Sequence, residues 1–260
     1  MSSPAAQPAG QRTALWICLG LVVGLLIAVP VSWRWVNAGM GTKIAVLGAG
    51  KQLSVLVTHD QRRVLIAAGS DGSAFSNALN AALPPVGDSI DVVLIDSRAS
   101  PDVGERARGL SAKRVLSLPD PDRAAEPTTV QQSFVLDLSD SVLVSFRLEP
   151  DGTWSARVET GAGVIAITPG PPSSRNSAVA ISLDGSDPAG AEERTGVVIG
   201  PRSADLQSGP RIATVSAGSV LSIRVEGDQL RLSSDFFNSG TSGERPDHLA
   251  RLDRELVFEL

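Results

Sequence analysis

Cysteine and histidine are both scarce in this chain. Among 260 residues there is one cysteine, Cys18, which lies inside an apolar run, and there are two histidines, His59 and His248. A single cysteine excludes an intrachain disulfide and a cysteine-based zinc site. Two histidines limit any metal site to two imidazole ligands, which argues against a dinuclear zinc site, and we expect no metal and no cofactor.

An excess of positive charge is also missing. The formal net charge is −5 at pH 7, whereas non-specific binding to phosphate backbones needs a basic field. A nucleic-acid partner is therefore not supported by charge. The densest basic group comprises Arg106, Arg108, Lys113 and Arg114, with Glu105 beside it. We interpret this group as a solvated helix face in preference to a site for phosphate or lipid headgroups.

One long apolar run is present near the N-terminus. Ala14–Trp33 contains no charged residue, and a helix of about 20 such residues crosses a hydrocarbon core of ~30 Å. Arginines bracket the run, and tryptophans lie at both of its ends, as they do at membrane interfaces. We predict a disordered tail over 1–13, one transmembrane helix over 14–36 and a globular domain over 39–260.

Three features of this segment leave alternatives open. Val36-Asn37-Ala38 also fits the cleavage site of a signal peptide, although the apolar run is longer than such peptides use. Gly20 and Gly24 form a GxxxG pattern, which favours a weak homodimer but also arises by chance. The numbers of basic residues before and after the apolar run differ little. They favour a domain on the cytoplasmic side of the membrane only slightly. The side of the membrane thus stays undetermined.

The first half of the domain is predicted to contain both strands and helices. Short β-type runs at 43–47, 53–58 and 63–68 predict an antiparallel meander. Ser73 is expected to cap a helix that ends at Pro84-Pro85. A strand at Asp91–Ile95, a helix starting at Ser100-Pro101 and a strand at Arg114–Leu118 then form a strand–helix–strand unit.

The second half is almost wholly β. We predict strands at 134–138, 142–148, 154–159, 164–168, 178–183, 197–199, 212–216, 220–225 and 230–233. Near the end, Leu249, Leu252 and Leu256 recur at helical spacing, which predicts a packed closing helix within 246–260. The fold class is therefore α+β with sheets dominant.

Several sequence segments in the first half of the domain match the sequence pattern of a known family. Ile44–Val57 (IAVLGAGKQLSVLV) has a strand, a turn with Gly50 and a second strand, Val64–Gly69 reads VLIAAG, and Ile90–Gly104 reads IDVVLIDSRASPDVG. Together they resemble the metallo-β-lactamase fold, most closely the soluble domain attached to bacterial competence channels that take up DNA. The resemblance covers 43–118 and is looser afterwards, at Gly196–Ala204. It implies an αββα sandwich, here preceded by one transmembrane helix.

The departures from that family concern its metal ligands. Asp96, Arg98, Ser100 and Pro101 stand where the resemblance implies His, His, Asp and His, and Ala67 replaces the aspartate of the VLIDxG strand. Proline offers no donor atom, and arginine repels a cation. The resemblance therefore implies a degenerate member whose zinc site is lost.

Other residues suggest weaker sites. Asp91, Asp96 and Asp102 are a candidate for a hard cation such as Mg²⁺, although each also fits a structural position at a strand end or in a first helical turn. His59 and Asp60 could assist a nucleophilic serine, but the sequence contains no GxSxG motif to supply one. We therefore favour a solvated turn at these two residues.

The sequence leads to one main hypothesis and two rivals. The main hypothesis is a membrane-anchored, non-catalytic domain of metallo-β-lactamase fold that serves as a binding or scaffolding module, with a protein partner. The rivals are a metal-dependent hydrolase with a relocated carboxylate site and an anchored extracytoplasmic β-sandwich for binding. Whether the chain is an enzyme stays open, with the lost ligands arguing against it.

Overall fold

Strands dominate the part of the chain that the structure describes. The structure is a computed structural model, and it describes residues 41–83, 89–119, 129–149, 152–170, 177–184, 197–201, 211–235 and 256–259. The predicted tail, the predicted membrane span with Gly20 and Gly24, and His248 lie outside these ranges. Within the ranges, no helix is both long and apolar enough to cross a membrane.

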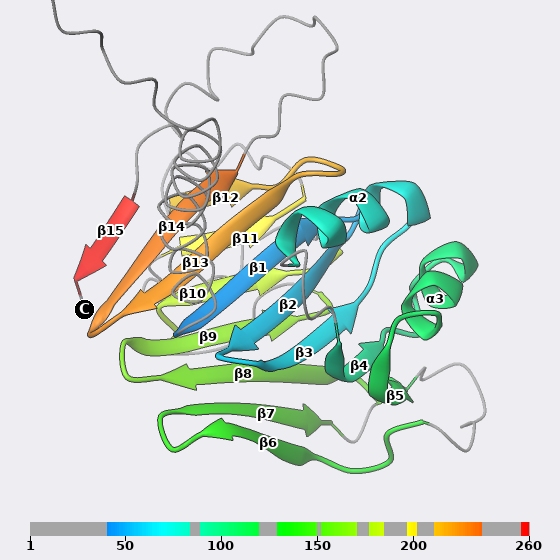
Figure 1. The fold of residues 1–260 in the computed structure, drawn as a ribbon, viewed down its shortest axis with the longest axis horizontal. Helices are drawn as coiled ribbons and strands as arrows, with labels where there is room; N and C mark the ends of the chain where they lie inside the picture. Colours follow the sequence, from blue (N-terminus) through cyan, green and yellow to red (C-terminus); the bar gives the residue numbers. More distant parts are fainter. Residues whose placement is uncertain are drawn as a thin grey trace, which may run out of the picture. The chain divides into compact units, whose positions relative to one another are not determined.

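The first sheet is built around the N-terminal meander (Figure 1). The predicted strands β1 (Thr42–Gly48), β2 (Leu53–His59) and β3 (Arg62–Ala67) pair antiparallel in that order. β4 (Ile90–Ile95) and β5 (Ala112–Ser117) extend the sheet parallel to β3. On its other side, β1 pairs antiparallel with β13 (Val220–Glu226). β14 (Gln229–Asp235) and then β15 (Leu256–Glu259) continue the sheet to its edge.

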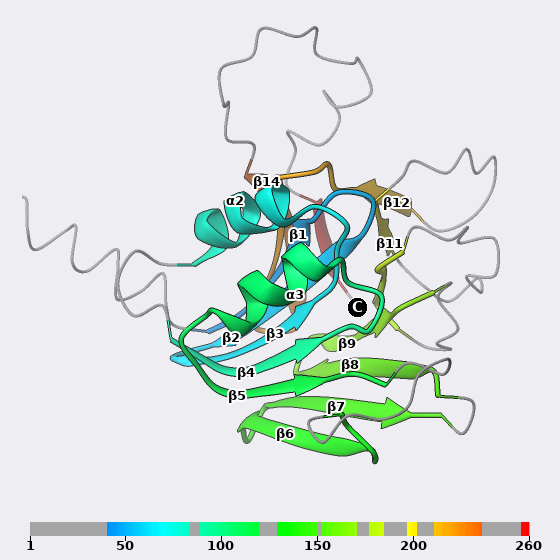
Figure 2. The ribbon, with the colours of Figure 1, turned by 90° about the vertical axis from the view of Figure 1, so that its right-hand side faces the viewer.

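Two helices cover one face of this sheet. α2 (Gly72–Ala82) connects β3 to β4, and α3 (Pro101–Arg108) connects β4 to β5, because parallel neighbours need a crossover connection. Figure 2 shows both helices on the same side of the sheet. Phe75 and Val103 are fully buried in the apolar cluster that the helices share with the outer face of β1 to β4. This layer positions the loops that follow β3 and β4.

The cap of α2 is Asp71, two residues before the predicted Ser73. Asp71 Oδ1 accepts hydrogen bonds from the backbone N–H groups of Ser73 and Ala74 at 2.8 and 3.1 Å, and from the Ser73 hydroxyl at 2.7 Å. These bonds lower the pKa of Asp71, the bond from the Ser73 hydroxyl contributing most. Aspartate caps a helix as well as serine does, and Asp71 takes the role because the helix begins at Gly72.

The second sheet combines an antiparallel and a parallel half. The antiparallel half contains β6 (Phe134–Ser139), β7 (Val142–Leu148), β8 (Trp154–Thr160) and β9 (Gly163–Thr168), each antiparallel to the next. The strands β10 (Val179–Ser182), β11 (Val197–Gly200) and β12 (Arg211–Thr214) continue parallel to β9. The sheet order is β12-β11-β10-β9-β8-β7-β6.

The main core lies between the two sheets. Alternate residues of β1, such as Ile44 and Val46, join Ile165 and Ile167 of β9 in one buried cluster. At its β6–β8 end, Phe146 stacks between Phe134 and Trp154, with ring centroids 5.1 and 5.4 Å apart. The fold class is α+β, as predicted. The described residues form three layers, helices, sheet and sheet, and the predicted second helical layer does not occur among them.

The predicted closing helix within 246–260 is corrected in part. Leu256–Glu259 forms β15, an edge strand that pairs antiparallel with β14, and the remainder of that range lies outside the described residues. The leucine spacing indicated a helix, but Val257 and Phe258 favour a strand locally. Pairing with β14 is a tertiary effect that the spacing does not contain.

Candidate functional site

The loop after β4, which carries the four altered ligand positions, is tied to the end of β3. Asp96 N–H donates to the carbonyl of Ala67 at 2.9 Å, and Ser100 N–H donates to the carbonyl of Gly69 at 2.8 Å. Within the loop, Ala99 N–H donates to the carbonyl of Asp96 at 3.0 Å. The backbone of the loop is thus fixed by main-chain hydrogen bonds.

Asp96 and Arg98 form an ion pair inside this loop. Asp96 is 2% exposed, so its carboxylate needs partners to be stable there. Oδ1 accepts from the backbone N–H of Arg98 at 2.9 Å, and Oδ2 lies 3.2 Å from Arg98 Nη2. Arg98 Nε adds a longer contact of 3.4 Å to Oδ1. One residue therefore supplies both the backbone and the side-chain donors that satisfy the buried carboxylate.

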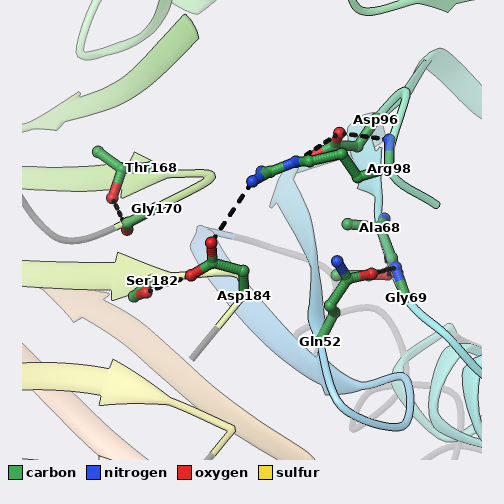
Figure 3. A network of polar contacts seen from close by, with 10 residues as sticks. Gln52, Ala68, Gly69, Asp96, Arg98, Thr168, Gly170, Ser182 and Asp184 are labelled. Atoms are coloured by element: carbon green, nitrogen blue, oxygen red, sulfur yellow. Dashed lines mark hydrogen bonds and ion pairs between the residues drawn. The ribbon is translucent and has the colours of Figure 1, made fainter. Parts of the chain in front are cut away.

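The same guanidinium reaches the second sheet (Figure 3). Arg98 Nη1 lies 3.4 Å from Oδ2 of Asp184, which follows β10. The other carboxylate oxygen of Asp184 lies 3.5 Å from the hydroxyl of Ser182. Beside this contact, Leu53 N–H donates to the carbonyl of Leu183 at 2.8 Å. We call the three charged residues Asp96, Arg98 and Asp184 the inter-sheet bridge.

Two glycines let the turn after β1 and the turn after β3 approach each other beside this loop. Gly50 has φ +88°, and a Cβ there would lie 2.5 Å from Ser70 Oγ. Gly69 has φ +144°, and a Cβ there would lie 2.5 Å from the Cβ of Ala49. Gly69 N–H also donates to Gln52 Oε1 at 3.1 Å. Glycine is required at both positions, which gives a physical reason for the glycine that the sequence resemblance placed at Gly50.

Ser100 and Pro101 start α3, as the sequence predicts. Ser100 has extended backbone angles, and its hydroxyl accepts from Val103 N–H at 3.4 Å. Pro101 occupies the first helical turn, where its fixed φ fits and its missing N–H costs nothing. Two of the four altered ligand positions therefore have a helix-starting role in this chain.

The residues of this loop do not fit a zinc ion. Asp96 is the one altered position that offers a ligand of the required kind, and its carboxylate already faces the Arg98 guanidinium. A second cation at the same place would meet the charge of Arg98. Among the described residues, no group of three or more His, Cys, Asp and Glu side chains is arranged to hold a metal.

The structure does not bring the carboxylates of Asp91, Asp96 and Asp102 together. Asp91 is the second residue of β4, and Asp96 follows the last residue of that strand. Five residues of extended chain place their Cα atoms about 16 Å apart. Asp102 is exposed in the first turn of α3. Among the described residues, the three carboxylates suggested for a hard cation are therefore not gathered into one group, and of the three only Asp96 belongs to the bridge.

His59 and Asp60 lie at the opposite end of the first sheet. His59 ends β2, with Nδ1 2.9 Å from the Thr42 hydroxyl and Nε2 3.5 Å from Asp60 Oδ2. β2 begins near the bridge at Leu53, and six strand residues separate the two ends by about 20 Å. These contacts support a structural turn, the reading that the sequence favoured.

The basic group of the sequence is dispersed over several contacts. Arg106 donates to the hydroxyl of Ser76 at 2.9 Å and so links α3 to α2. Lys113 Nζ lies 2.6 Å from Asp91 Oδ1. Arg108 and Arg114 are exposed on α3 and β5. This arrangement agrees with a solvated surface that helps to hold the helices and strands together.

Asp184 is the site residue that sequence reasoning missed. It belongs to the second half, where the family resemblance is loose, and it stands in a loop sequence, Leu183-Asp184-Gly185, that contains no motif. The one available signal was the charge of Arg98. Asp96, two residues before it, is a local partner for that charge, and nothing in the sequence identifies Asp184 as a second partner.

The comparisons with known proteins give no family. No family model matches the chain, and no curated protein matches it. Solved structures that match include Zn²⁺-bound PqqB from Methylobacterium extorquens, 13% identical, covering 54% of this chain and 70% of that one with a TM-score of 0.35. The peroxy diiron form of the chemotaxis sensor ODP is 16% identical, covers 51% of this chain and 61% of that one, and has a TM-score of 0.30. TM-scores this low carry no inference about this chain.

Proposed function

We propose that this chain is a membrane-tethered, non-catalytic domain of metallo-β-lactamase-like fold that serves as a binding or scaffolding module. The tether is the apolar segment 14–36 of the sequence. The fold is supported by the order of elements in the first half, where a meander leads into the strand–helix–strand unit of β4, α3 and β5. The resemblance to the soluble domain of competence channels rests only on the sequence segments within 43–118.

The inter-sheet bridge is the observation that carries this proposal. It stands in the loop where the family resemblance implies metal ligands, and it joins that loop to the end of β10 in the second sheet. The positive charge between the two carboxylates belongs to Arg98. A cation supplied by the chain itself cannot activate a bound water as a zinc ion does. The arrangement therefore suits a structural role better than hydrolysis.

The two rival functions find less support. A relocated carboxylate site needs several carboxylates close together, and Asp91, Asp96 and Asp102 are spread along β4 and α3. A β-sandwich consists of two antiparallel sheets. In this chain, two helices cover the first sheet, and four strands of the second sheet are parallel.

Zinc content is the direct test of the proposal. The full chain, purified in detergent and dialysed against zinc and then against buffer, should retain far less than one zinc per chain by elemental analysis. It should also leave a phosphodiester substrate intact. Stoichiometric zinc together with hydrolysis that a chelator stops would contradict the proposal.

Arg98→Ala in the same preparation tests the role of the bridge. It should lower the free energy of unfolding by about 1–3 kcal/mol, because the buried Asp96 carboxylate loses its charged donors, and it should not create a zinc site. The matched control is Arg114→Ala, which removes an exposed arginine from β5 and should change stability by less than about 0.5 kcal/mol. Equal stability of the two variants would argue that the bridge holds nothing in place.

A further inference from the structure

β6 is the last strand of the second sheet, and its outer edge pairs with no strand of the described residues (Figures 1 and 2). On its other edge it pairs antiparallel with β7. Among the described residues, Val135 of this strand is the one large apolar side chain that is mostly exposed, at 61%. A free strand edge with an exposed apolar residue is a place where another extended chain can add.

The backbone N–H and C=O of Val135 point to this free edge. Glu149 N–H, at the end of β7, donates to the carbonyl of Thr153 on the β8 side at 2.8 Å. Because hydrogen-bonding directions alternate along an antiparallel strand, Phe146 faces β6 and Ser145 faces β8. Ser145 is the residue opposite Val135, so the Val135 backbone groups point away from β7. Within the described part of the chain, no hydrogen bond to those two groups is found.

The free stretch of this edge has two defined ends. At one end, the carbonyl of Asp137 accepts from Arg62 Nη1 at 2.7 Å, and a bulge after Asp137 shifts the register with β7. Bulges and charges at a strand edge limit further pairing. At the other end, the Ser133 hydroxyl accepts from Leu148 N–H at 3.0 Å, which leaves the hydroxyl proton for an acceptor. The stretch open to pairing is therefore 133–137.

This stretch is complementary to itself in one antiparallel register. With Val135 opposite Val135 of a second copy, outward backbone groups meet each other, and Ser133 lies opposite Asp137 of that copy. Two apolar side chains then meet on the twofold axis, and a hydroxyl meets a carboxylate, both of which are favourable cross-strand pairs. A shift of two residues in one direction would set Val135 against a carboxylate, and a shift in the other would set it against a serine hydroxyl.

We propose that β6 pairs antiparallel with β6 of a second copy of this chain, with Val135 on the twofold axis. The inference goes beyond the proposed function and does not depend on the tether. The two second sheets then form one continuous sheet, with seven strands from each copy. Phe134 and Leu136, which are half-buried beside the inter-sheet core, lie opposite each other across the new pairing and extend that core. A contact through one short strand is smaller than a standard interface, so the dimer is weak and depends on concentration.

Single-cysteine cross-linking in the full chain tests this register. Cys18→Ser removes the native thiol, and Val135→Cys, Ser133→Cys and Asp137→Cys each place one thiol on the free stretch. The proteins are purified in detergent and oxidised with copper phenanthroline, and covalent dimer is measured on non-reducing gels. Two opposed residues have Cα atoms about 5.5 Å apart, within the range of a disulfide, whereas residues four positions out of register are about 13 Å apart.

The expected pattern distinguishes pairing from random collision. Val135→Cys should form covalent dimer about tenfold faster than Ser133→Cys or Asp137→Cys alone, because only its two thiols face each other. An equimolar mixture of the Ser133→Cys and Asp137→Cys chains should regain the fast rate, since those two positions are opposed. Equal rates in all three single variants would mean random collision, and absence of dimer from Val135→Cys would leave the edge to an extended segment of another protein. Either result would overturn the inference.

A second set of variants separates strand pairing from apolar contact. Val135→Pro removes the outward N–H without breaking a hydrogen bond to β7, and proline is tolerated on edge strands. In the mixed Ser133→Cys and Asp137→Cys chains it should slow cross-linking about tenfold, because two hydrogen bonds across the axis are lost. Val135→Thr keeps the N–H and the β-branched shape and should slow cross-linking less than about threefold.

A further variant covers the case in which Val135→Pro shows no cooperative thermal transition. Val135→Asp then takes its place, since it opposes two carboxylates on the axis and should also slow cross-linking about tenfold. A rate that the folded variant does not lower, or that Val135→Thr lowers equally, would overturn the inference.

Discussion

At the scale of the residue, Ser100 has taken a structural role where the family resemblance implies a ligand. Its hydroxyl caps α3 through Val103 N–H. We predict that Ser100→Ala lowers the free energy of unfolding by about 0.5–1 kcal/mol, in the lower part of the range for N-caps because the bond is long. Guanidinium titration of the full chain in detergent measures this. Ser111→Ala is the control, since Ser111 is exposed before β5; an equal loss there would exclude a capping role.

The residue scale also shows what a sequence can and cannot provide. Ser100 and Pro101 were predicted because a helix start depends on neighbours within four residues. The sequence analysis chose Ser73 as the cap of α2 and missed Asp71, because aspartate and serine are both residue types that cap helices. Asp184 could not be predicted as the partner of Arg98, because 86 positions separate them and only the packing of two sheets brings them to 3.4 Å.

At the scale of the element, Asp91 joins three neighbouring strands. From β4, its carboxylate accepts from Arg63 N–H of β3 at 2.7 Å and from Lys113 Nζ of β5 at 2.6 Å. Burial raises the pKa of Asp91, but the hydrogen bonds from Lys113 and Arg63 outweigh that effect, and the pKa is lowered overall. The carboxylate is therefore stabilised in its ionised form by the edge of the sheet.

This lowered pKa predicts a specific dependence of stability on pH. Its contribution to stability is fully present above the unfolded pKa of about 3.9 and is lost as the pH falls through the lowered folded pKa. Asp91→Asn should therefore be less stable than the parent at pH 7, with a difference that shrinks in acid. Urea titrations at pH 7 and pH 3 measure this. Asp140→Asn, in the exposed turn between β6 and β7, is the control for the substitution itself and should change stability by less than about 0.5 kcal/mol at pH 7. An Asp91→Asn deficit that persisted unchanged in acid would contradict the prediction.

The elements themselves were largely predictable from the sequence. The strands of the meander and β6 to β9 have alternating or continuous β-branched runs bounded by glycine or polar turns, so their positions follow from local pattern. β15 was missed because its leucine also fits a helical spacing. Its pairing with β14 spans a long stretch of chain, which local pattern does not encode.

At the scale of the molecule, the arrangement of the sheets was the part that could not be predicted. Placing β13 beside β1 joins residues about 180 positions apart in the chain, as in the pair of Lys43 and Arg224. The parallel order of β9 to β12 likewise depends on crossovers that have no sequence signature. The family resemblance implied two sheets in contact, but its close matches end at β5 and only one looser match, at 196–204, follows.

We expect the domain that follows the predicted membrane span to fold without it. Residues from Gly41 onward form one compact unit, and no second apolar run of about 18 residues follows in the sequence. We predict that removal of 1–38 gives a soluble domain with one cooperative thermal transition, whereas the full chain requires detergent. Size-exclusion chromatography and calorimetry measure both. A fragment that aggregated without a transition would mean that the removed segment belongs to the fold.

The stacking of Trp154 against Phe146 has a practical consequence for such a fragment. Three of the four tryptophans, Trp16, Trp33 and Trp35, lie in the removed segment, and the chain contains no tyrosine. The intrinsic ultraviolet emission of the domain would then come from one indole, which is 4% exposed between the two sheets. The parting of the sheets at β8 could be followed without any label, as a red shift of that single emitter.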